Sequence, residues 1–600
     1  MSHPKDCIIY CDSINALEKL LRERPALNGC LILTSSPALL KAHPNSAVSL
    51  YSKMSEQDFI EERNLTKKII KTTFDYLGEI NCDELSLVCA SKILSSFQIF
   101  NKLHALTCHG KFKKLIICKY KDEVTKKTEL LNLPLEDFIP SELYEIYEYE
   151  EHSPYQFKHD KISFGTRIGK AGIKNIFYRL LIKFYQIFPN VLSHKKIFIY
   201  KENDLLMEAA VDLAIRGFSL HYIRPSKDTQ NKVIKKELSL SETDQLISDW
   251  NKKLDDIYKP FFSKYVHTLL NEEIYSYHLL KERWKESFNL YDKKSIMGVL
   301  TNSPSRVDSR SLHTVLKNYK IPLISFQHGV TREISKYHDL VEINFEGNSS
   351  DYFITFNKMA EEISKAIYYS QATTFTAGTS KRFTNIPRKI SSDSKNFVYV
   401  STNLPRGHVS YFMGDHDDCV DSAEEEKVIR NILAKVNTTI DFKPYLFDNR
   451  RFPDRDYISK DIEEGKFKNI HLLKDKVDMR YLLNKYEVII TTKATSTVSW
   501  PILGNRPTVF LNFDNSSPVA ENVKVEFEKS LFFFDIKDEE DYKKVVDFLN
   551  LPLNQIKQQW VEKSSERRKL VKKYFSDNLK SGSKNAAKFI KSELNSPKPL

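Results

Sequence analysis

The chain has 600 residues, 41% of them hydrophobic and 28% charged, and a formal net charge of +12. This length is enough for roughly three or four compact domains, which excludes a small scaffold held by disulfides. No basic leader with an apolar segment opens the chain, and no window offers about 18 uninterrupted apolar residues. We therefore expect a cytoplasmic protein that is neither secreted nor membrane-spanning. The positive charge is dispersed and not gathered into a stripe, which argues against nucleic-acid binding and suits anionic substrates or an anionic membrane surface.

The eight cysteines predict free thiols. They lie mostly in strand-like apolar runs and form no C-x-x-C pair. Buried thiols in a reducing compartment explain this pattern better than disulfides or a zinc site.

The first 150 residues predict an α/β subdomain. Apolar runs at 7–11, 30–34 and 114–118 are typical of strands, and Ser13 is placed to cap the helix that follows the first run. Alternation of strands and helices is typical of a parallel sheet covered by helices. The acidic, proline-containing stretch 131–155 is interpreted as a connection.

Residues 151–390 predict a doubly wound lobe. The aromatic and basic segment 177–188 predicts a helix that either packs in the core or lies at a membrane interface. A helix over 204–216, closed by Gly217, and a helical block over 241–289 are expected between the strands. The expected strands are 196–200, 220–223, 296–301, 321–327, 352–356 and 374–378.

A polar stretch at 390–395 predicts a linker to a second doubly wound lobe over 391–552. Residues 553–600 predict a basic helical extension. The fold class is therefore α/β, with two Rossmann-like doubly wound lobes, the first of them enlarged, and a cleft between them where ligands usually bind. The expected strands of this lobe are 396–402, 439–447, 470–473, 487–492 and 507–512.

The strand at 321–327 ends in Gln327-His328-Gly329. The carboxyl ends of parallel strands are where such sheets bind ligands. His328 is a candidate acid/base or phosphate-contacting group, and Gly329 allows a ligand close to the backbone. The alternative is an ordinary histidine in a strand-to-loop turn.

A second motif follows the strand 486–492. The turn into the next helix carries Thr495, Ser496, Thr497 and Ser499. Hydroxyl groups there cap the helix, and they also place donors where a helix N-terminus favours a phosphate. An ordinary cap explains one hydroxyl well and four less well. Upstream, Lys443-Pro444 ends a strand and offers a cation to a phosphate.

Three carboxylates are candidate catalytic groups: Glu333, shortly after Gln-His-Gly, then Glu202 and Asp308. Glu202-Asn203-Asp204 faces the same crevice by the strand-end rule, but it is also a plausible N-cap. No Asp-x-Asp ends a strand, so we expect no obligatory metal. The acidic run 415–418 is a possible cation site in principle, and we interpret it as a solvated loop.

The combination of motifs resembles bacterial GT-B glycosyltransferases of surface polysaccharide (capsule and lipopolysaccharide) biosynthesis. It consists of Gln327-His328-Gly329, Lys443-Pro444 and the hydroxyl cluster before Gly504-x-x-Pro507. The nearest likeness is to enzymes that use CMP-activated acidic sugars, such as Kdo and sialic acid transferases. In those enzymes the pair is usually His-Pro, so Lys443 replaces the histidine. The resemblance covers roughly residues 195–515.

The resemblance implies transfer of an activated sugar, CMP-linked and of the acidic ulosonic type, to a glycan, lipid-linked glycan or glycoprotein. It implies no cofactor beyond the nucleotide-sugar donor, and peripheral contact with the inner membrane face is compatible with it. The first lobe would face the acceptor through Gln327, His328 and Gly329. The second lobe would bind the nucleotide through Lys443, Pro444, Thr402, Asn403, Thr495, Ser496, Thr497 and Ser499.

Two alternatives stay open. One is a polyol-phosphate transferase of the CDP-glycerol type, which also uses a His-Gly element and a basic-Pro pair. The other is a non-catalytic glycan-assembly protein on a decayed transferase fold, which the missing histidine before Pro444 favours.

Overall fold

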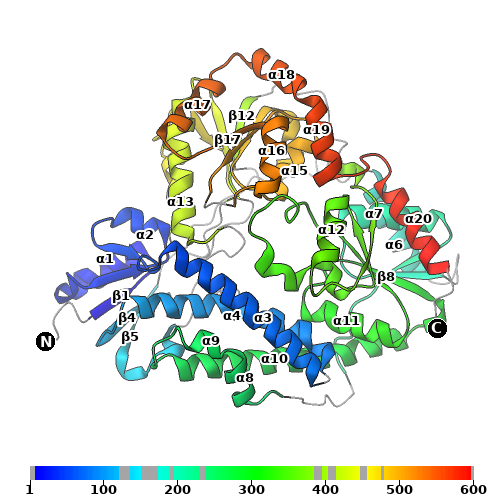
Figure 1. Cartoon of the computed structure of the whole chain (residues 1–600), viewed down its shortest axis with the longest axis horizontal. Coiled ribbons are helices and arrows are strands. Elements are labelled where there is room, and N and C mark those ends of the chain that lie inside the picture. The colour runs from blue at the N-terminus through cyan, green and yellow to red at the C-terminus, as the bar shows by residue number, and fades with distance from the viewer. Residues whose placement is uncertain are drawn as a thin grey trace.

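Three parallel sheets organise the chain (Figure 1). The computed structural model describes residues 7–595 apart from 81, 121–134, 151–172, 189–194, 230–236, 384–394, 403–413, 446–453, 455, 475–478 and 515–516. Most of the predicted linker at 390–395 lies outside the described residues, as does Asn403. All eight cysteines are free, as predicted, and six of them are buried.

The first sheet has the order β3-β2-β1-β4-β5. Ser13 caps α1 (Ile14–Glu23), as expected. The interpretation of 131–155 as a connection is wrong, because β5 lies within it and pairs with β4. In its second half, Tyr147 and Tyr149 are buried on one face and Glu148 between them is exposed on the other. The strands are β1 (Cys7–Tyr10), β2 (Leu31–Thr34), β3 (Ala47–Ser49), β4 (Lys114–Tyr120) and β5 (Tyr144–Tyr149).

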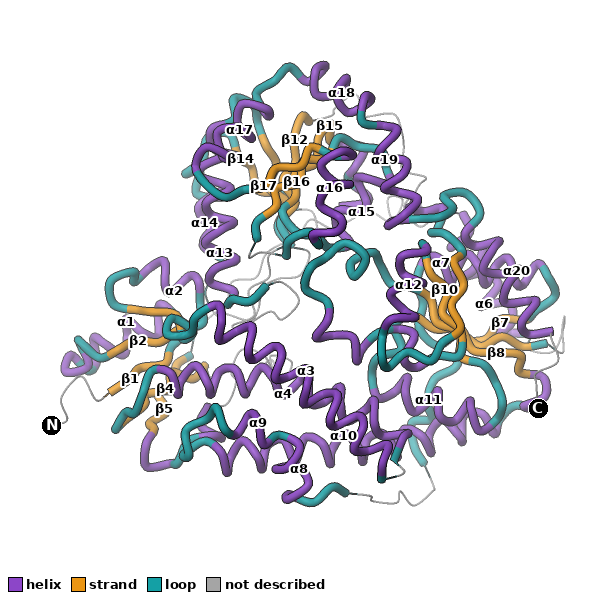
Figure 2. Tube along the Cα trace, viewed as in Figure 1, coloured by secondary structure: helices purple, strands orange, loops and turns teal. Residues whose placement is uncertain are grey.

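Long helices join this subdomain to the first lobe (Figure 2). They bury one core that includes Phe100, Trp250 and Phe262. Trp250 stacks on Phe100, with ring centroids 5.0 Å apart. The predicted domain boundary at residue 150 therefore does not separate two cores, because helices from both sides of it share this one. The long helices are α3 (Glu56–Glu79), α4 (Asp83–Cys108) and α10 (Lys259–Asn289), and the short helices α8 (Leu240–Leu246) and α9 (Ser248–Asn251) contribute to the same core.

The second sheet forms the first lobe in the order β11-β10-β9-β8-β6-β7. Each predicted strand of this region is present. Its helices are α6 (Ile173–Ile187), α7 (Asp204–Ile215), α11 (Val307–Asn318) and α12 (Lys358–Ala366). Its strands are β6 (Lys196–Ile199), β7 (Ser219–Tyr222), β8 (Ile296–Asn302), β9 (Leu323–Phe326), β10 (Tyr352–Thr355) and β11 (Thr373–Thr376).

The third sheet forms the second lobe in the order β14-β13-β12-β15-β16-β17. The sequence predicted five of its strands and missed the edge strand β17. Its helices are α13 (Asp418–Lys427), α14 (Tyr457–Glu463), α15 (Ser496–Leu503), α16 (Glu521–Ser530) and α17 (Glu539–Leu549). Its strands are β12 (Lys395–Val400), β13 (Ile440–Lys443), β14 (Ile470–Leu472), β15 (Tyr486–Thr491), β16 (Thr508–Asn512) and β17 (Phe532–Asp535).

The C-terminal helices connect the two lobes. Trp560 of α18 (Leu553–Glu562) and Leu570 of α19 (Ser564–Leu570) lie in the core of the second lobe. The chain then returns to the first lobe, where the Tyr574 carbonyl accepts a hydrogen bond from Asn357 Nδ2 at 2.7 Å. The last helix, α20 (Gly582–Asn595), packs on α7. The prediction of two doubly wound parallel lobes is confirmed. No described helix is both long and apolar enough to cross a membrane.

Candidate functional site

A cleft of about 510 Å³ lies between the two lobes. The first lobe contributes the carboxyl ends of β6, β8 and β9, and the second contributes the ends of β12 and β13 and the start of α15. The cleft thus brings together predicted residues from distant parts of the sequence. These are Glu202, His328, Thr402, Lys443, Pro444, Ser496 and Thr497.

His328 is exposed in the cleft at the end of β9 and is oriented by two asparagines. Asn203 caps α7, because its Oδ1 accepts a hydrogen bond from the Leu206 N–H at 2.9 Å. Its Nδ2 therefore donates to the Gln327 carbonyl at 3.0 Å and to Asn302 Oδ1 at 3.2 Å. Asn302 in turn has its Nδ2 3.3 Å from His328 Nδ1. The three side chains come from adjacent strand ends.

This chain of hydrogen bonds favours one tautomer of His328. An amide nitrogen only donates, so Nδ1 of the ring accepts and the neutral ring carries its proton on Nε2. The ring therefore offers an N–H donor to a ligand. Of the two predicted roles, contact with a phosphate fits this geometry, whereas proton abstraction through Nε2 requires the other tautomer.

Gln327 and Glu333 lie beneath the histidine and not in the cleft. Gln327 Oε1 accepts from the Phe356 N–H at 2.6 Å, and its Nε2 donates to Glu333 Oε1 at 2.5 Å. Asn357 and the Thr331 N–H also donate to the Glu333 carboxylate. Burial raises the pKa of Glu333 to about 7 despite these donors. Gln327 was predicted to bind substrate and Glu333 to act in catalysis, but the structure places both side chains in the buried support of the Gln-His-Gly turn and outside the cleft lining.

The side chains of the turn at residues 495–499, which we name the hydroxyl turn, have different roles. Thr495 caps α15 by accepting from the Thr497 N–H. Ser496 and Thr497 line the cleft at the helix N-terminus, while Ser499 is buried outside the lining. Lys443 approaches the same cleft from the end of β13. A buried cation beside a helix N-terminus favours a phosphate group.

Gly329 is the point where the first lobe touches this turn. A Cβ added to Gly329 would lie 3.2 Å from the Cβ of Ser496. Gly329 was predicted to let a ligand approach the backbone. In the structure, the absence of a side chain at Gly329 instead leaves room for Ser496 of the opposite lobe. The Gln-His-Gly tip and the hydroxyl turn face each other directly.

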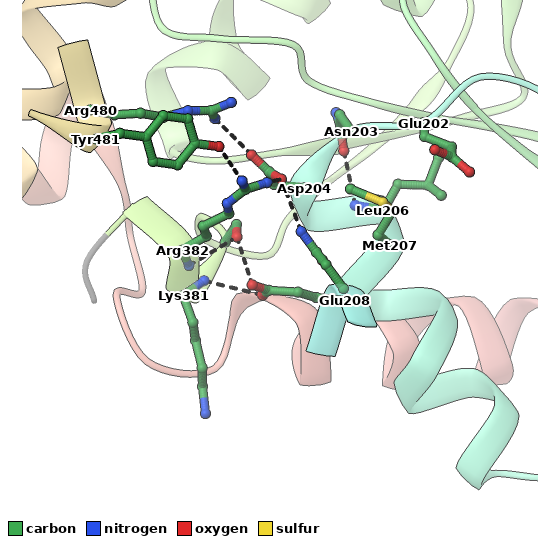
Figure 3. A network of polar contacts seen from close by, with 12 residues as sticks. Glu202, Asn203, Asp204, Leu206, Met207, Glu208, Lys381, Arg382, Arg480 and Tyr481 are labelled. Carbon is green, nitrogen blue, oxygen red and sulfur yellow. Dashed lines mark hydrogen bonds and ion pairs between the residues drawn. The ribbon is translucent and has the colours of Figure 1, made fainter. Parts of the chain in front are cut away.

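An ionic network crosses the cleft beside these residues (Figure 3). Asp204, buried at the start of α7, bonds to Arg382 of the first lobe and to Arg480 of the second, the latter at 2.8 Å. Arg382 also donates to the Tyr481 hydroxyl. The sequence did not predict this network, because Arg382 and Arg480 lie in short 3₁₀ segments without a recognisable pattern. With Lys443, the two arginines give the cleft three cationic groups.

The two other predicted carboxylates are already engaged. Glu202 lines the cleft but receives two hydrogen bonds from Arg179, at 3.0 and 2.6 Å, and one from Tyr178. Asp308 is not in the cleft lining. Burial raises the pKa of Asp308, but hydrogen bonds from Tyr200 and Lys201 outweigh it and hold the pKa below its usual value. Glu202 is therefore the predicted carboxylate that a ligand can reach.

The interpretation of 415–418 as a solvated loop is wrong. Asp415 accepts a hydrogen bond from Arg63 at 2.6 Å, and Asp417 accepts one from Ser49 at 2.6 Å. His416 contacts Asp421, which also forms a buried ion pair with Lys493 at 2.5 Å. The run thus joins the second lobe to the first subdomain. Among the described residues, no three His, Cys, Asp or Glu side chains gather as a metal site.

No protein-family model matches the chain, and no curated protein is similar to it in sequence. Among solved structures, the chain is similar to a UDP-glucosyltransferase from Polygonum tinctorium, at 10% identity and a TM-score of 0.38, over 68% of this chain and 100% of that one. It is similar to Medicago truncatula UGT71G1, at 8% identity and a TM-score of 0.37, over 67% and 98%. It is also similar to Acinetobacter baumannii MurG, at 10% identity and a TM-score of 0.32, over 66% and 99%.

Proposed function

We propose that the chain is a nucleotide-sugar-dependent glycosyltransferase of the GT-B type. The observation that carries the proposal is the cleft, where His328 of one lobe faces Lys443 and the turn of Ser496 and Thr497 of the other. Glycosyl transfer from a nucleotide sugar leaves negative charge on the departing phosphate. Cations, a helix N-terminus and fixed N–H donors stabilise such charge. The second lobe would bind the nucleotide, and the first would present the acceptor.

In this proposal each cleft residue has a separate role. Lys443 and the start of α15 bind the phosphate next to the sugar. The Nε2–H of His328 donates a hydrogen bond to an oxygen of the leaving phosphate. Glu202, held by Arg179, lies on the acceptor side and orients the acceptor hydroxyl.

For the donor, we propose a CMP-linked acidic sugar. Such a donor carries two separated anions, one phosphate and one sugar carboxylate. The cleft offers cations in two places, Lys443 at the end of β13 and the Arg382 and Arg480 pair around Asp204. Bidentate binding by arginine suits a carboxylate. The acceptor class, a surface glycan or a lipid-linked glycan, is part of the same proposal.

A thermal-shift screen against CMP, CDP, UDP and GDP tests this function. Binding to the folded state raises the apparent stability by RT ln(1 + [L]/Kd). CMP is expected to raise the unfolding temperature of the wild-type chain and to lose most of that effect with Lys443→Met. Lys427→Met, which removes an exposed lysine from the same lobe, is the matched control. Absence of binding to all four nucleotides would contradict the proposal, and a phosphodiester product would point to the polyol-phosphate alternative.

A further inference from the structure

A second group of reactive side chains lies outside the cleft, between helices α3 and α4, which run side by side (Figure 1). Glu62 belongs to α3, and His104 and Cys108 belong to α4. His104 and Cys108 are four residues apart, so they lie on the same face of the helix on successive turns. The function proposed for the cleft uses none of the three.

The carboxylate of Glu62 holds the ring of His104. Glu62 is 1% exposed, and its Oε1 lies 2.5 Å from His104 Nδ1. Asn101, one turn earlier on α4, donates a hydrogen bond to the other oxygen of this carboxylate. Nδ1 is therefore occupied, and Nε2 is the ring nitrogen that remains for Cys108, with which His104 forms a hydrogen bond. Carboxylate, imidazole and thiol thus follow one another, and they do not gather around one point as metal ligands do.

The ring of His104 carries a second proton at neutral pH. Burial lowers the pKa of His104, but hydrogen bonds with Cys108 and Glu62 outweigh it and raise the pKa to about 9. An imidazolium beside a thiol stabilises the thiolate, which is the nucleophilic form of cysteine. The place in the helix acts the other way, because Cys108 is the last residue of α4 and the C-terminal end of a helix disfavours negative charge. Any excess reactivity of this thiol therefore has to come from His104.

Cys108 is also the cysteine that solvent reaches. Six of the eight cysteines are buried and Cys419 is partly buried, whereas Cys108 is exposed. A buried acid and histidine next to an exposed sulfur form an arrangement that activates cysteine nucleophiles. The sulfur is therefore open to reagents, while the two groups that activate it are fixed in the protein.

We propose that Cys108 is a site of reversible thiol modification that reacts with low-molecular-weight disulfides. The Cys108 thiolate attacks one sulfur of the disulfide, so that a new S–S bond to Cys108 Sγ forms and the S–S bond of the reagent breaks. The departing thiolate takes the proton from Nε2 of His104 and leaves as a thiol. Cys108 is oxidised and the departing sulfur is reduced, and exchange with another thiol reverses the step. The proposal does not depend on the glycosyltransferase function.

Reaction of the whole chain with oxidised glutathione tests the proposal, with the adduct on Cys108 followed over time by peptide mass spectrometry. A free thiol is only a few per cent ionised at pH 7, so complete ionisation raises its rate by roughly thirtyfold. A thiolate stabilised by a cation is a weaker nucleophile, which removes part of this gain. We therefore expect Cys108 in the wild-type chain to react about tenfold faster than an ordinary exposed thiol.

The matched control is Ile215→Cys in a Cys108→Ser background. Ile215 is 73% exposed and, like Cys108, is the last residue of its helix, but Val211 occupies the position one turn before it. His104→Asn is the second variant, because it keeps an N–H donor for Glu62 and lacks the ring nitrogen that reaches Cys108. Cys108 in this variant is expected to react no faster than the thiol introduced by Ile215→Cys.

The same comparison with iodoacetamide, which is uncharged, should give the same order of rates. Equal rates for wild-type Cys108 and the control thiol with both reagents would overturn the proposal and leave Glu62 and His104 as a structural pair. This comparison leaves His104 unchanged, so it holds even if thermal unfolding shows that His104→Asn does not fold. In a folded His104→Asn chain, a Cys108 that still reacts as fast as in the wild type would also overturn the proposal.

Discussion

Replacing Gly329 by alanine is expected to weaken nucleotide binding while leaving the fold intact. The new Cβ would lie 3.2 Å from the Cβ of Ser496, whereas carbon atoms pack best at about 3.5–4.0 Å. The hydroxyl turn or the whole lobe must therefore move by roughly half an ångström. Overpacking costs about 1–3 kcal/mol. Because the strain falls on the contact between lobes, we expect about tenfold weaker binding, equivalent to about 1.4 kcal/mol.

Titration calorimetry with the nucleotide that the screen identifies measures this effect, and urea unfolding measures the stability. Gly298→Ala is the control, since its Cβ would meet Leu594 and the Pro322 carbonyl at 3.4 Å and it does not line the cleft. The double variant Gly329→Ala with Ser496→Gly removes the clash and should recover part of the affinity. Unchanged affinity in Gly329→Ala, or a loss equal to that of Gly298→Ala, would refute the idea that the two motifs bind one ligand together.

Three further predictions concern the groups around the cleft. Asn302→Asp should reverse the tautomer of His328, because a carboxylate accepts a hydrogen bond from Nδ1–H. It should therefore raise the apparent pKa in the pH profile of nucleotide binding, whereas Asn302→Leu should not. Equal pH profiles for the two variants would refute the chain of hydrogen bonds from Asn203 through Asn302 to His328. Because the pKa of Glu333 is raised to about 7, its contribution to stability is complete below about pH 4.5 and declines as the pH rises through 7, by up to about 3 kcal/mol. Glu333→Gln should flatten the dependence of the unfolding free energy on pH in this range. An unaltered slope would contradict the raised pKa of Glu333. The Asp204→Asn variant should bind pyrophosphate several-fold more tightly, because the carboxylate no longer competes for Arg382 and Arg480. The Arg480→Met variant should bind pyrophosphate about tenfold more weakly. Weaker binding in both variants would show that Asp204 only positions the arginines.

The repeating parts of the fold follow from local patterns in the sequence. Buried parallel strands read as short apolar runs, and in a parallel sheet their carboxyl ends meet at one edge. This is why His328, Lys443 and Ser496 were predicted from separate motifs and meet in one cleft. The strands β5 and β17 were missed because β5 mixes tyrosines and glutamates with a single aliphatic residue, and β17 is a short aromatic edge strand.

The parts of the site that the sequence did not predict depend on contacts between distant segments. Arg382 and Arg480 belong to the site because both bind Asp204, which lies more than 170 positions from either of them in the sequence. Gln327 was predicted to bind substrate and Glu333 to be catalytic because both lie near His328 in the sequence. The chain instead turns both side chains inward, where Gln327 bonds to the Phe356 N–H and to Glu333. A sequence pattern specifies which residues end a strand, and it does not specify which way each of them faces after the turn.

The central claim is that one nucleotide binds between the lobes and contacts both. Calorimetric titration of CMP into the wild type, Lys443→Met and His328→Ala tests it most directly, because these residues belong to opposite lobes. The account predicts one site per chain and at least tenfold weaker binding in each variant. Binding that either variant leaves unchanged, or no binding of CMP, CDP, UDP or GDP to the wild-type chain, would contradict it.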